Sequence, residues 1–189
     1  MIQDPYKYLA VNVVNWWENF GRKTLPWQTN PSEYKTWISE IMLQQTQVNT
    51  AEPYFHRFME RFPTVEELAS SSLDEVLQMW SGLGYYARAR NIHRSAQLII
   101  KQHKGELPSD YESLLDLPGI GKSTAGAILS LSGIEPKPIL DGNVKRVLSR
   151  FFGVKGWSGE SKVSKELWDL SANSHLQIIF KFTHKESWI

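Results

Sequence analysis

The sequence predicts an all-α protein built from many short helices joined by tight turns. Three observations support this fold class. Apolar residues recur at helical spacing along most of the 189 residues. Residues that suit helix N-caps precede several of these runs, and glycines follow them. No segment shows the alternation that is typical of a strand, and we find no repeat and no low-complexity linker.

The N-terminal part of the chain is expected to form three helices. The first covers residues 6–20 and is ended by Gly21. The second covers residues 32–45, and the third covers residues 47–61. The periodic apolar side chains that predict the first two helices are Leu9, Val13, Trp16, Trp17, Phe20, Trp37, Ile38, Ile41 and Met42.

The middle and C-terminal parts are also expected to be helical. Residues 86–104 form a long helix ended by Gly105, and further helices cover residues 123–131, 142–152 and 161–170. Three short helices begin at capping boxes, in which a hydroxyl residue is followed by Glu three positions on. The capping boxes are Thr64 with Glu67, Ser72 with Glu75, and Ser109 with Glu112.

Composition restricts the class of protein. With 41% hydrophobic residues and eight Trp, the chain has enough apolar material for a sizeable core. It has no apolar run of about 18 residues, and its N-terminus lacks the regions of a signal peptide, so we expect a cytoplasmic protein. The lack of cysteine excludes disulfides and thiolate metal sites.

The charge is nearly balanced, with 21 basic and 20 acidic residues, which is not the global signature of a nucleic-acid binder. Two segments are nevertheless locally basic. Each is either a solvated helix face or part of a nucleic-acid surface. The two clusters are Arg88, Arg90, His93, Arg94, Lys101 and Lys104, and Lys145, Arg146 and Arg150.

The most informative motif is a glycine hairpin at residues 117–127, which joins a short helix to the start of a second one. The free backbone N–H groups of a helix N-terminus bind anions such as phosphate. About twenty residues further on, Asp141 lies in a Gly-Asn turn before another helix. A phosphate-binding hairpin followed by an acid indicates chemistry on a nucleic acid.

Two carboxylates are candidates for that chemistry. Glu40 has mostly apolar neighbours, and burial would favour its protonated form, as a general acid requires. Alternatively, Glu40 lies on the polar face of an amphipathic helix. Asp141 can be a helix N-cap, a role that also keeps the carboxylate ionised. One protonated and one ionised carboxylate are the pair that glycosidic-bond cleavage needs.

Two short polar or aromatic segments lie at helix ends, next to turns. They are residues 44–46, with the sequence Gln-Gln-Thr, and the pair Tyr85 and Tyr86. Amides and aromatic rings in such places can enter a base stack that has lost a nucleotide. The alternatives are ordinary polar surface for the first segment and core aromatics for the second.

Four motifs in order make a family resemblance specific. They occupy residues 42–48, 82–91, 117–126 and 139–146. Together they resemble the helix-hairpin-helix base-excision glycosylases, and within that superfamily the adenine DNA glycosylases of the MutY type. The resemblance covers residues 16–170. It implies a six-helix barrel and a second helical subdomain, with the DNA and the active site between them.

The resemblance also implies a domain organisation. Residues 28–135 are expected to form the six-helix barrel, with the helix-hairpin-helix at about residues 111–131. Residues 1–27 and 136–189 are expected to form the second subdomain. That subdomain would be incomplete, because the family's iron–sulfur region and C-terminal recognition domain are missing.

The resemblance implies catalytic roles for three residues. Glu40 matches the acid that protonates the departing adenine. Asp141 matches the carboxylate that stabilises the oxocarbenium-like sugar, and Asn143 matches an asparagine of the same pocket.

It also implies DNA contacts. Gln45, with Thr46 beside it, matches the residue that wedges into the DNA stack, and Tyr85 matches an aromatic that intercalates next to 8-oxoguanine. The residues that match the phosphate-binding hairpin are Leu117, Pro118, Gly119, Ile120, Gly121 and Lys122.

Ser123 separates two chemistries. In the related glycosylase-lyases of the endonuclease III type, this position holds a lysine that forms a Schiff base. Lys122 is adjacent, but one helical residue is a rotation of about 100°, so it should face elsewhere. The sequence therefore predicts a monofunctional glycosylase.

The implied function is removal of adenine mispaired with 8-oxoguanine or guanine in double-stranded DNA. The resemblance implies a monomer without membrane partners, located in the bacterial cytoplasm with the nucleoid. Two alternatives stay open. One is a non-catalytic helix-hairpin-helix remnant that only binds DNA, and the other is a sister glycosylase that acts on another base, such as mismatched thymine.

The match fades after Leu170, where the family continues with four cysteines that hold a [4Fe-4S] cluster. Without cysteine no such cluster is expected in this chain. His175 and His184 are too few, and wrongly spaced, to replace those ligands. The tail resembles a frameshift or truncation product, so we expect the barrel to fold with reduced stability and activity.

Overall fold

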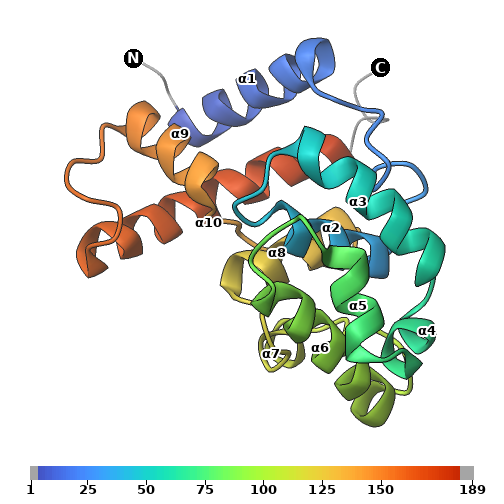
Figure 1. Cartoon of the computed structure of the whole chain (residues 1–189). Helices are drawn as coiled ribbons and strands as arrows, with labels where there is room; N and C mark the ends of the chain where they lie inside the picture. The colour runs from blue at the N-terminus through green and yellow to red at the C-terminus, as the bar shows by residue number, and fades with distance from the viewer. Residues whose placement is uncertain (1–3, 184–189) are drawn as a thin grey trace. The chain divides into compact units, whose positions relative to one another are not determined.

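The computed structural model describes residues 4–183, with side chains described as far as residue 174. Every regular element in this range is an α-helix, which confirms the all-α class (Figure 1). Within the same range, no helix is both long enough and apolar enough to cross a membrane. The helices belong to two compact units: Thr24–Ile134 forms one, and the segments before and after it form the other.

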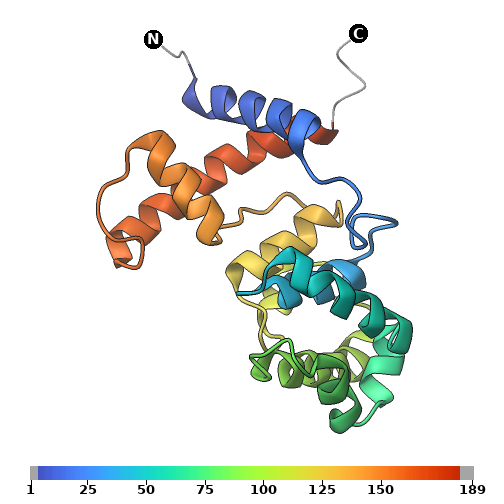
Figure 2. The same cartoon turned by 45° about the horizontal axis from the view of Figure 1, so that its top comes forward.

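The unit Thr24–Ile134 is organised around one central helix. Helix α2 contacts α3, α6 and α8, and Figures 1 and 2 show how the helices of this unit are arranged. Trp37, Ile38 and Met42 of α2 are completely buried in the core of this unit. Closure into a six-helix barrel stays a prediction. The helices of this unit are α2 (Glu33–Leu43), α3 (Val48–Arg61), α4 (Val65–Ser70), α5 (Leu73–Trp80), α6 (Ala87–His103), α7 (Tyr111–Leu115) and α8 (Lys122–Leu131).

Capping residues start the short helices of this unit. Ser72 and Glu75 form a complete capping box at α5, and the backbone N–H of Ser72 is the main reason why the pKa of Glu75 falls to about 2. The Thr64 hydroxyl caps α4. The box expected at Ser109 is wrong, because Asp110 caps α7 instead. Two adjacent residues could serve as the cap there, and the sequence pattern does not choose between them.

The other unit contains α1 (Pro5–Phe20), α9 (Gly142–Phe152) and α10 (Ser161–Thr183), and α1 lies along α10 (Figures 1 and 2). Helix α10 continues well past the end expected at residue 170. His175 and His184 lie outside the residues whose side chains are described. The buried apolar residues of this unit's core are Leu9, Leu140, Leu148, Val163 and Leu167.

The apolar stripe expected on α1 is only partly buried. Leu9 is in the core, but Trp16 is 59% exposed and Phe20 is 72% exposed. The residues that α1 buries are Leu9, Ala10 and Val14, which all precede Trp16 and Phe20 in the chain. Helical periodicity alone therefore overestimated how far the core extends along this helix.

Candidate functional site

Glu40 lies in the last part of α2, where most neighbouring side chains are buried. Residues 36–39 and 41–42 are buried, whereas Glu40 is half-buried. Its carboxyl group is thus neither sealed in the core nor placed on a fully exposed helix face. Because α2 is packed on several sides, the backbone at Glu40 is held firmly while part of its side chain stays accessible.

Four non-glycine residues of this unit lie in the left-handed region: Asn30, Gln45, Tyr85 and Lys104. Gln45 and Tyr85 belong to two loops that the sequence motifs single out. We call residues 44–46 the Gln loop and residues 82–86 the Tyr loop. Gln45 has φ +57° and Tyr85 has φ +50°, and the Tyr85 side chain is 62% exposed. Such a backbone costs a non-glycine residue about 1–2 kcal/mol. It persists only where the surroundings fix it, and such residues cluster at functional sites.

The Gln loop is also tied to α8. Gln44 Nε2 donates a hydrogen bond of 3.3 Å to Thr124 Oγ1, one residue after Ser123. Thr46 Oγ1 donates to the Gln44 carbonyl at 3.4 Å. The segment that carries Gln45 is therefore tied to the beginning of α8 through Gln44 and closed by a hydrogen bond within the loop.

Arg88, near the start of α6, joins the two loops. Its guanidinium donates to main-chain carbonyls at the end of α2 and in the Tyr loop, and to Thr46 Oγ1. The residue is only 8% exposed. The basic cluster expected over α6 is therefore not a single solvated face: Arg88 and His93 are buried, and His93 Nε2 lies 2.9 Å from the Ser71 carbonyl. The sequence contains no local signal for this burial.

The glycine hairpin is anchored by its apolar residues and exposes its glycines. Leu117 and Ile120 are buried in the core of the unit, while Gly119, Gly121 and Lys122 are exposed and Pro118 is half-buried. Ser95 Oγ of α6 donates to the Pro118 carbonyl at 3.0 Å. Helix α6 therefore holds both the hairpin and, through Arg88, the two loops.

Helix α8 begins at the hairpin with Gly121 as its N-cap, and no side chain caps it. Ser123 is half-buried in its first turn, and Lys122 is exposed. A helix N-terminus that no side chain occupies presents backbone N–H groups to an anion. The geometry fits the phosphate-binding role that the hairpin motif suggests.

Asp141 and Asn143 lie at the beginning of α9, in the other unit. Asp141 is the N-cap, and its Oδ1 accepts the Val144 N–H at 2.7 Å, which confirms the capping alternative. Asn143 Oδ1 accepts from Arg146 Nη2 at 2.8 Å. Both side chains are exposed. Capping fixes the Asp141 carboxyl group against the helix and still leaves one oxygen for another partner.

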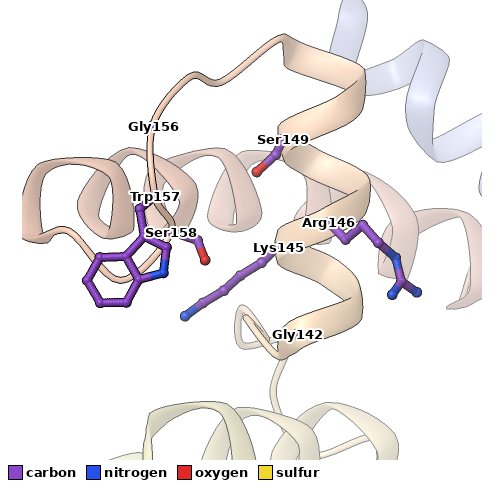
Figure 3. A pocket seen from close by; sticks show the side chains of 7 residues that line it. All are labelled: Gly142, Lys145, Arg146, Ser149, Gly156, Trp157 and Ser158. Carbon is purple, nitrogen blue, oxygen red and sulfur yellow. The ribbon is translucent and has the colours of Figure 1, made fainter.

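A hollow of about 330 Å³ lies between α9 and the loop that follows it. In Figure 3, Lys145 extends toward the side of Trp157, whereas Arg146 points to the opposite side of α9. Trp157 is 76% exposed. Sequence reasoning did not single out this tryptophan. The lining residues are Gly142, Lys145, Arg146, Ser149, Gly156, Trp157 and Ser158.

Residues 38–173 match the family described as HhH-GPD superfamily base excision DNA repair protein. Two relatives are proteins named adenine DNA glycosylase. The one from Buchnera aphidicola subsp. Acyrthosiphon pisum is 55% identical over 158 residues, which is 84% of this chain and 45% of that protein. The human one is 39% identical over 82% of this chain and 30% of its own length. This chain thus spans less than half the length of the curated relatives it matches.

Solved structures with the same fold include a thermostable thymine-DNA glycosylase and a non-covalent endonuclease III–DNA complex. The first has a TM-score of 0.80 and 23% identity, covering 94% of this chain and 85% of that one. The second has a TM-score of 0.70 and 22% identity, covering 93% and 83%. The resemblance inferred from the four motifs agrees with both kinds of comparison.

Proposed function

Since the chain belongs to the HhH-GPD superfamily of base excision DNA repair proteins, we propose that it removes adenine from double-stranded DNA by cleaving the N-glycosidic bond. The observation that carries the proposal is the 55% identity to an adenine DNA glycosylase. A stretch of 158 residues in a chain of this length must contain Glu40, Ser123 and Asp141 wherever it begins. The aligned stretch therefore spans the positions of the proposed catalytic residues.

In the proposed reaction, the bond between the sugar C1′ and the base nitrogen breaks, and its electron pair leaves with adenine. Glu40 donates a proton to the departing base. The ionised Asp141 stabilises the positive charge that grows on the sugar, and Asn143 supports the same site. Water then adds to C1′ and loses a proton, which leaves an abasic site.

The proposed DNA contacts come from the exposed hairpin and the two loops. The N–H groups at the start of α8 would hold a phosphate, and Gln45 and Tyr85 would enter the base stack beside the extruded nucleotide. The opposing base in this proposal is 8-oxoguanine or guanine. We further propose that the chain acts as a monomer in the cytoplasm, with the nucleoid.

The [4Fe-4S] cluster of the family does not fit these 189 residues. The chain has no cysteine, so the thiolates that hold such a cluster are missing from it. The described residues likewise contain no group of three or more His, Cys, Asp or Glu side chains placed to hold a metal. We propose that these residues bind no cluster by themselves, and the proposed reaction does not use one.

The experiment that tests the function is a panel of duplexes with one labelled target base. We expect release of adenine opposite 8-oxoguanine and guanine, little release opposite thymine, and no release of thymine opposite guanine. Release of thymine instead would indicate a sister glycosylase. Binding of every duplex without release of any base would instead support the alternative that the chain only binds DNA and has no catalytic activity.

Ser123 leads to an expectation about the DNA strand. Serine cannot form a Schiff base with the sugar, so the strand should stay intact after base release and break only on treatment with alkali. Gel electrophoresis with and without alkali measures this. The matched variant is Ser123→Lys, which we expect to give a covalent complex on borohydride trapping. Trapping of the unmodified chain at a similar yield would contradict the expectation.

The hairpin glycines give a second expectation. At Gly119, φ is +82° and an added Cβ would lie 3.0 Å from Asn91, so Gly119→Ala should lower both thermal stability and DNA affinity. At Gly121 the space around an added Cβ is open. Gly121→Ala should therefore lower the Tm only slightly, as alanine is a poorer N-cap than glycine. It should lose DNA affinity about 10-fold, because its methyl group obstructs the phosphate.

Thermal melts and salt-matched DNA titrations measure these effects. Unchanged DNA affinity in Gly121→Ala would show that the hairpin backbone does not approach the DNA.

A further inference from the structure

We propose that Arg88 is a positioning residue that holds the Gln loop and the Tyr loop together as one rigid wedge for the DNA base stack. This inference rests on the proposed function and deepens it. It assigns a role to a residue that contacts no DNA in the proposal and acts only through Gln45 and Tyr85.

The first half of the argument concerns the end of α2. Arg88 Nη1 donates to the carbonyls of Ile41 at 3.0 Å, Met42 at 2.8 Å and Gln44 at 2.6 Å. The last carbonyls of a helix lack intrahelical partners and carry partial negative charge. A guanidinium at this place therefore satisfies them and fixes the backbone on both sides of Leu43, just before Gln45.

The second half concerns the other loop. Arg88 Nη2 donates to Thr46 Oγ1 at 3.1 Å, and to the carbonyls of Gly84 at 3.3 Å and Leu83 at 3.4 Å. The guanidinium carbon also lies 5.4 Å from the centre of the Tyr85 ring. One planar group thus contacts the residues directly before and after Gln45 and the two residues directly before Tyr85.

Only arginine suits this position. Its planar guanidinium donates hydrogen bonds in two directions at once, whereas the compact ammonium of lysine can contact only one loop at a time. The group is buried, and burial lowers the pKa of Arg88. A buried cation is stable only where the groups around it pair with it. Here its acceptors belong to the end of α2 and to the two loops.

The expected consequence is coupling between the loops. Two strained segments that share one anchor are organised before DNA arrives, so their insertion costs little ordering. Without the anchor, both loops would relax together, and the Gln45 and Tyr85 side chains would lose their joint placement. Loss of Arg88 should therefore impair the unstacking of the DNA and slow adenine release. It should affect the overall affinity for duplex DNA less.

The experiment uses the full chain and a duplex with 2-aminopurine next to the target adenine, whose fluorescence rises when the neighbouring stack opens. The variants are Arg88→Met and Arg88→Lys. The matched control is Arg90→Met, which removes the same charge from an exposed position of the same helix. Circular dichroism monitors folding, and single-turnover adenine release gives the rate.

We expect the unmodified chain and Arg90→Met to raise the fluorescence, and both Arg88 variants to lose most of this rise. The release rate of the Arg88 variants should fall about 10- to 100-fold, as a misplaced group causes. Adding Gln45→Ala to Arg88→Met should cost much less than Gln45→Ala costs alone, because neighbouring residues that act as a unit are not additive.

Three results would overturn the role of Arg88. The first is a fluorescence rise in Arg88→Met equal to that of Arg90→Met, and the second is additive effects of Arg88→Met and Gln45→Ala on the release rate. The third is loss of helical signal in both Arg88 variants, which would indicate a purely structural role. The failure of the proposed function looks different: the unmodified chain itself would then bind the duplex without raising the fluorescence or releasing adenine.

Discussion

Glu40→Gln is expected to reduce adenine release about 10²- to 10⁴-fold, the usual contribution of a general acid. The amide has nearly the same size and can still accept a hydrogen bond, but it has no acidic proton for the departing base. Because Glu40 is half-buried on a well-packed helix, the substitution should leave the fold intact. Single-turnover release from an A·8-oxoguanine duplex measures the effect.

The matched control is Glu33→Gln, on the exposed first turn of the same helix. It removes the same charge from α2, and the release rate should stay close to that of the unmodified chain. DNA affinity should be similar in all three proteins. A Glu40→Gln variant that releases adenine as fast as Glu33→Gln would remove Glu40 from the mechanism.

Asp141→Asn is expected to lower the release rate about 10²- to 10³-fold, as loss of one electrostatic contact to a transition state does. Asparagine is as good an N-cap as aspartate, so it should keep the contact to the Val144 N–H and the stability of α9. The substitution thus removes the negative charge and leaves the cap. Rate measurements together with thermal melts separate the two roles.

Two further variants complete this test. Asp141→Ala removes both cap and charge, so it should lose the rate and also about 1 kcal/mol of stability. Asp4→Asn makes the same exchange at the N-cap of α1, where Asp4 accepts from the N–H groups of Tyr6 and Lys7, and should change neither rate nor stability. A stable Asp141→Asn variant with an unchanged rate would leave Asp141 with the capping role alone.

Local signals in the sequence were enough to locate most helices. The Asp-Gly-Asn turn and Gly153 define α9, whose observed bounds are those expected. Gly21 likewise ends α1 as predicted. Helix α10 was underestimated because the periodicity of its apolar residues weakens after Leu170, although the helix itself continues. Caps and glycines are local, so they can be recognised without knowledge of the packing.

The anchoring of the candidate site could not be predicted in the same way. In the sequence, Arg88 is indistinguishable from the other charged residues of a basic helix. Its burial depends on carbonyl groups more than forty residues away in the sequence. Positions 45 and 85 are not glycines, so the sequence does not indicate that their backbone is left-handed. The burial of Arg88 depends on contacts between α2 and α6, which only the folded chain brings together.

The central claim is that Glu40 and Asp141 act together to free adenine from DNA. The most direct measurement incubates the unmodified chain with an A·8-oxoguanine duplex under single-turnover conditions and identifies the released base by mass spectrometry. We predict free adenine in amounts equal to the abasic sites formed, with both products reduced at least about 100-fold in Glu40→Gln and Asp141→Asn. Bound duplex without any free adenine, in the unmodified chain as in both variants, would contradict the claim.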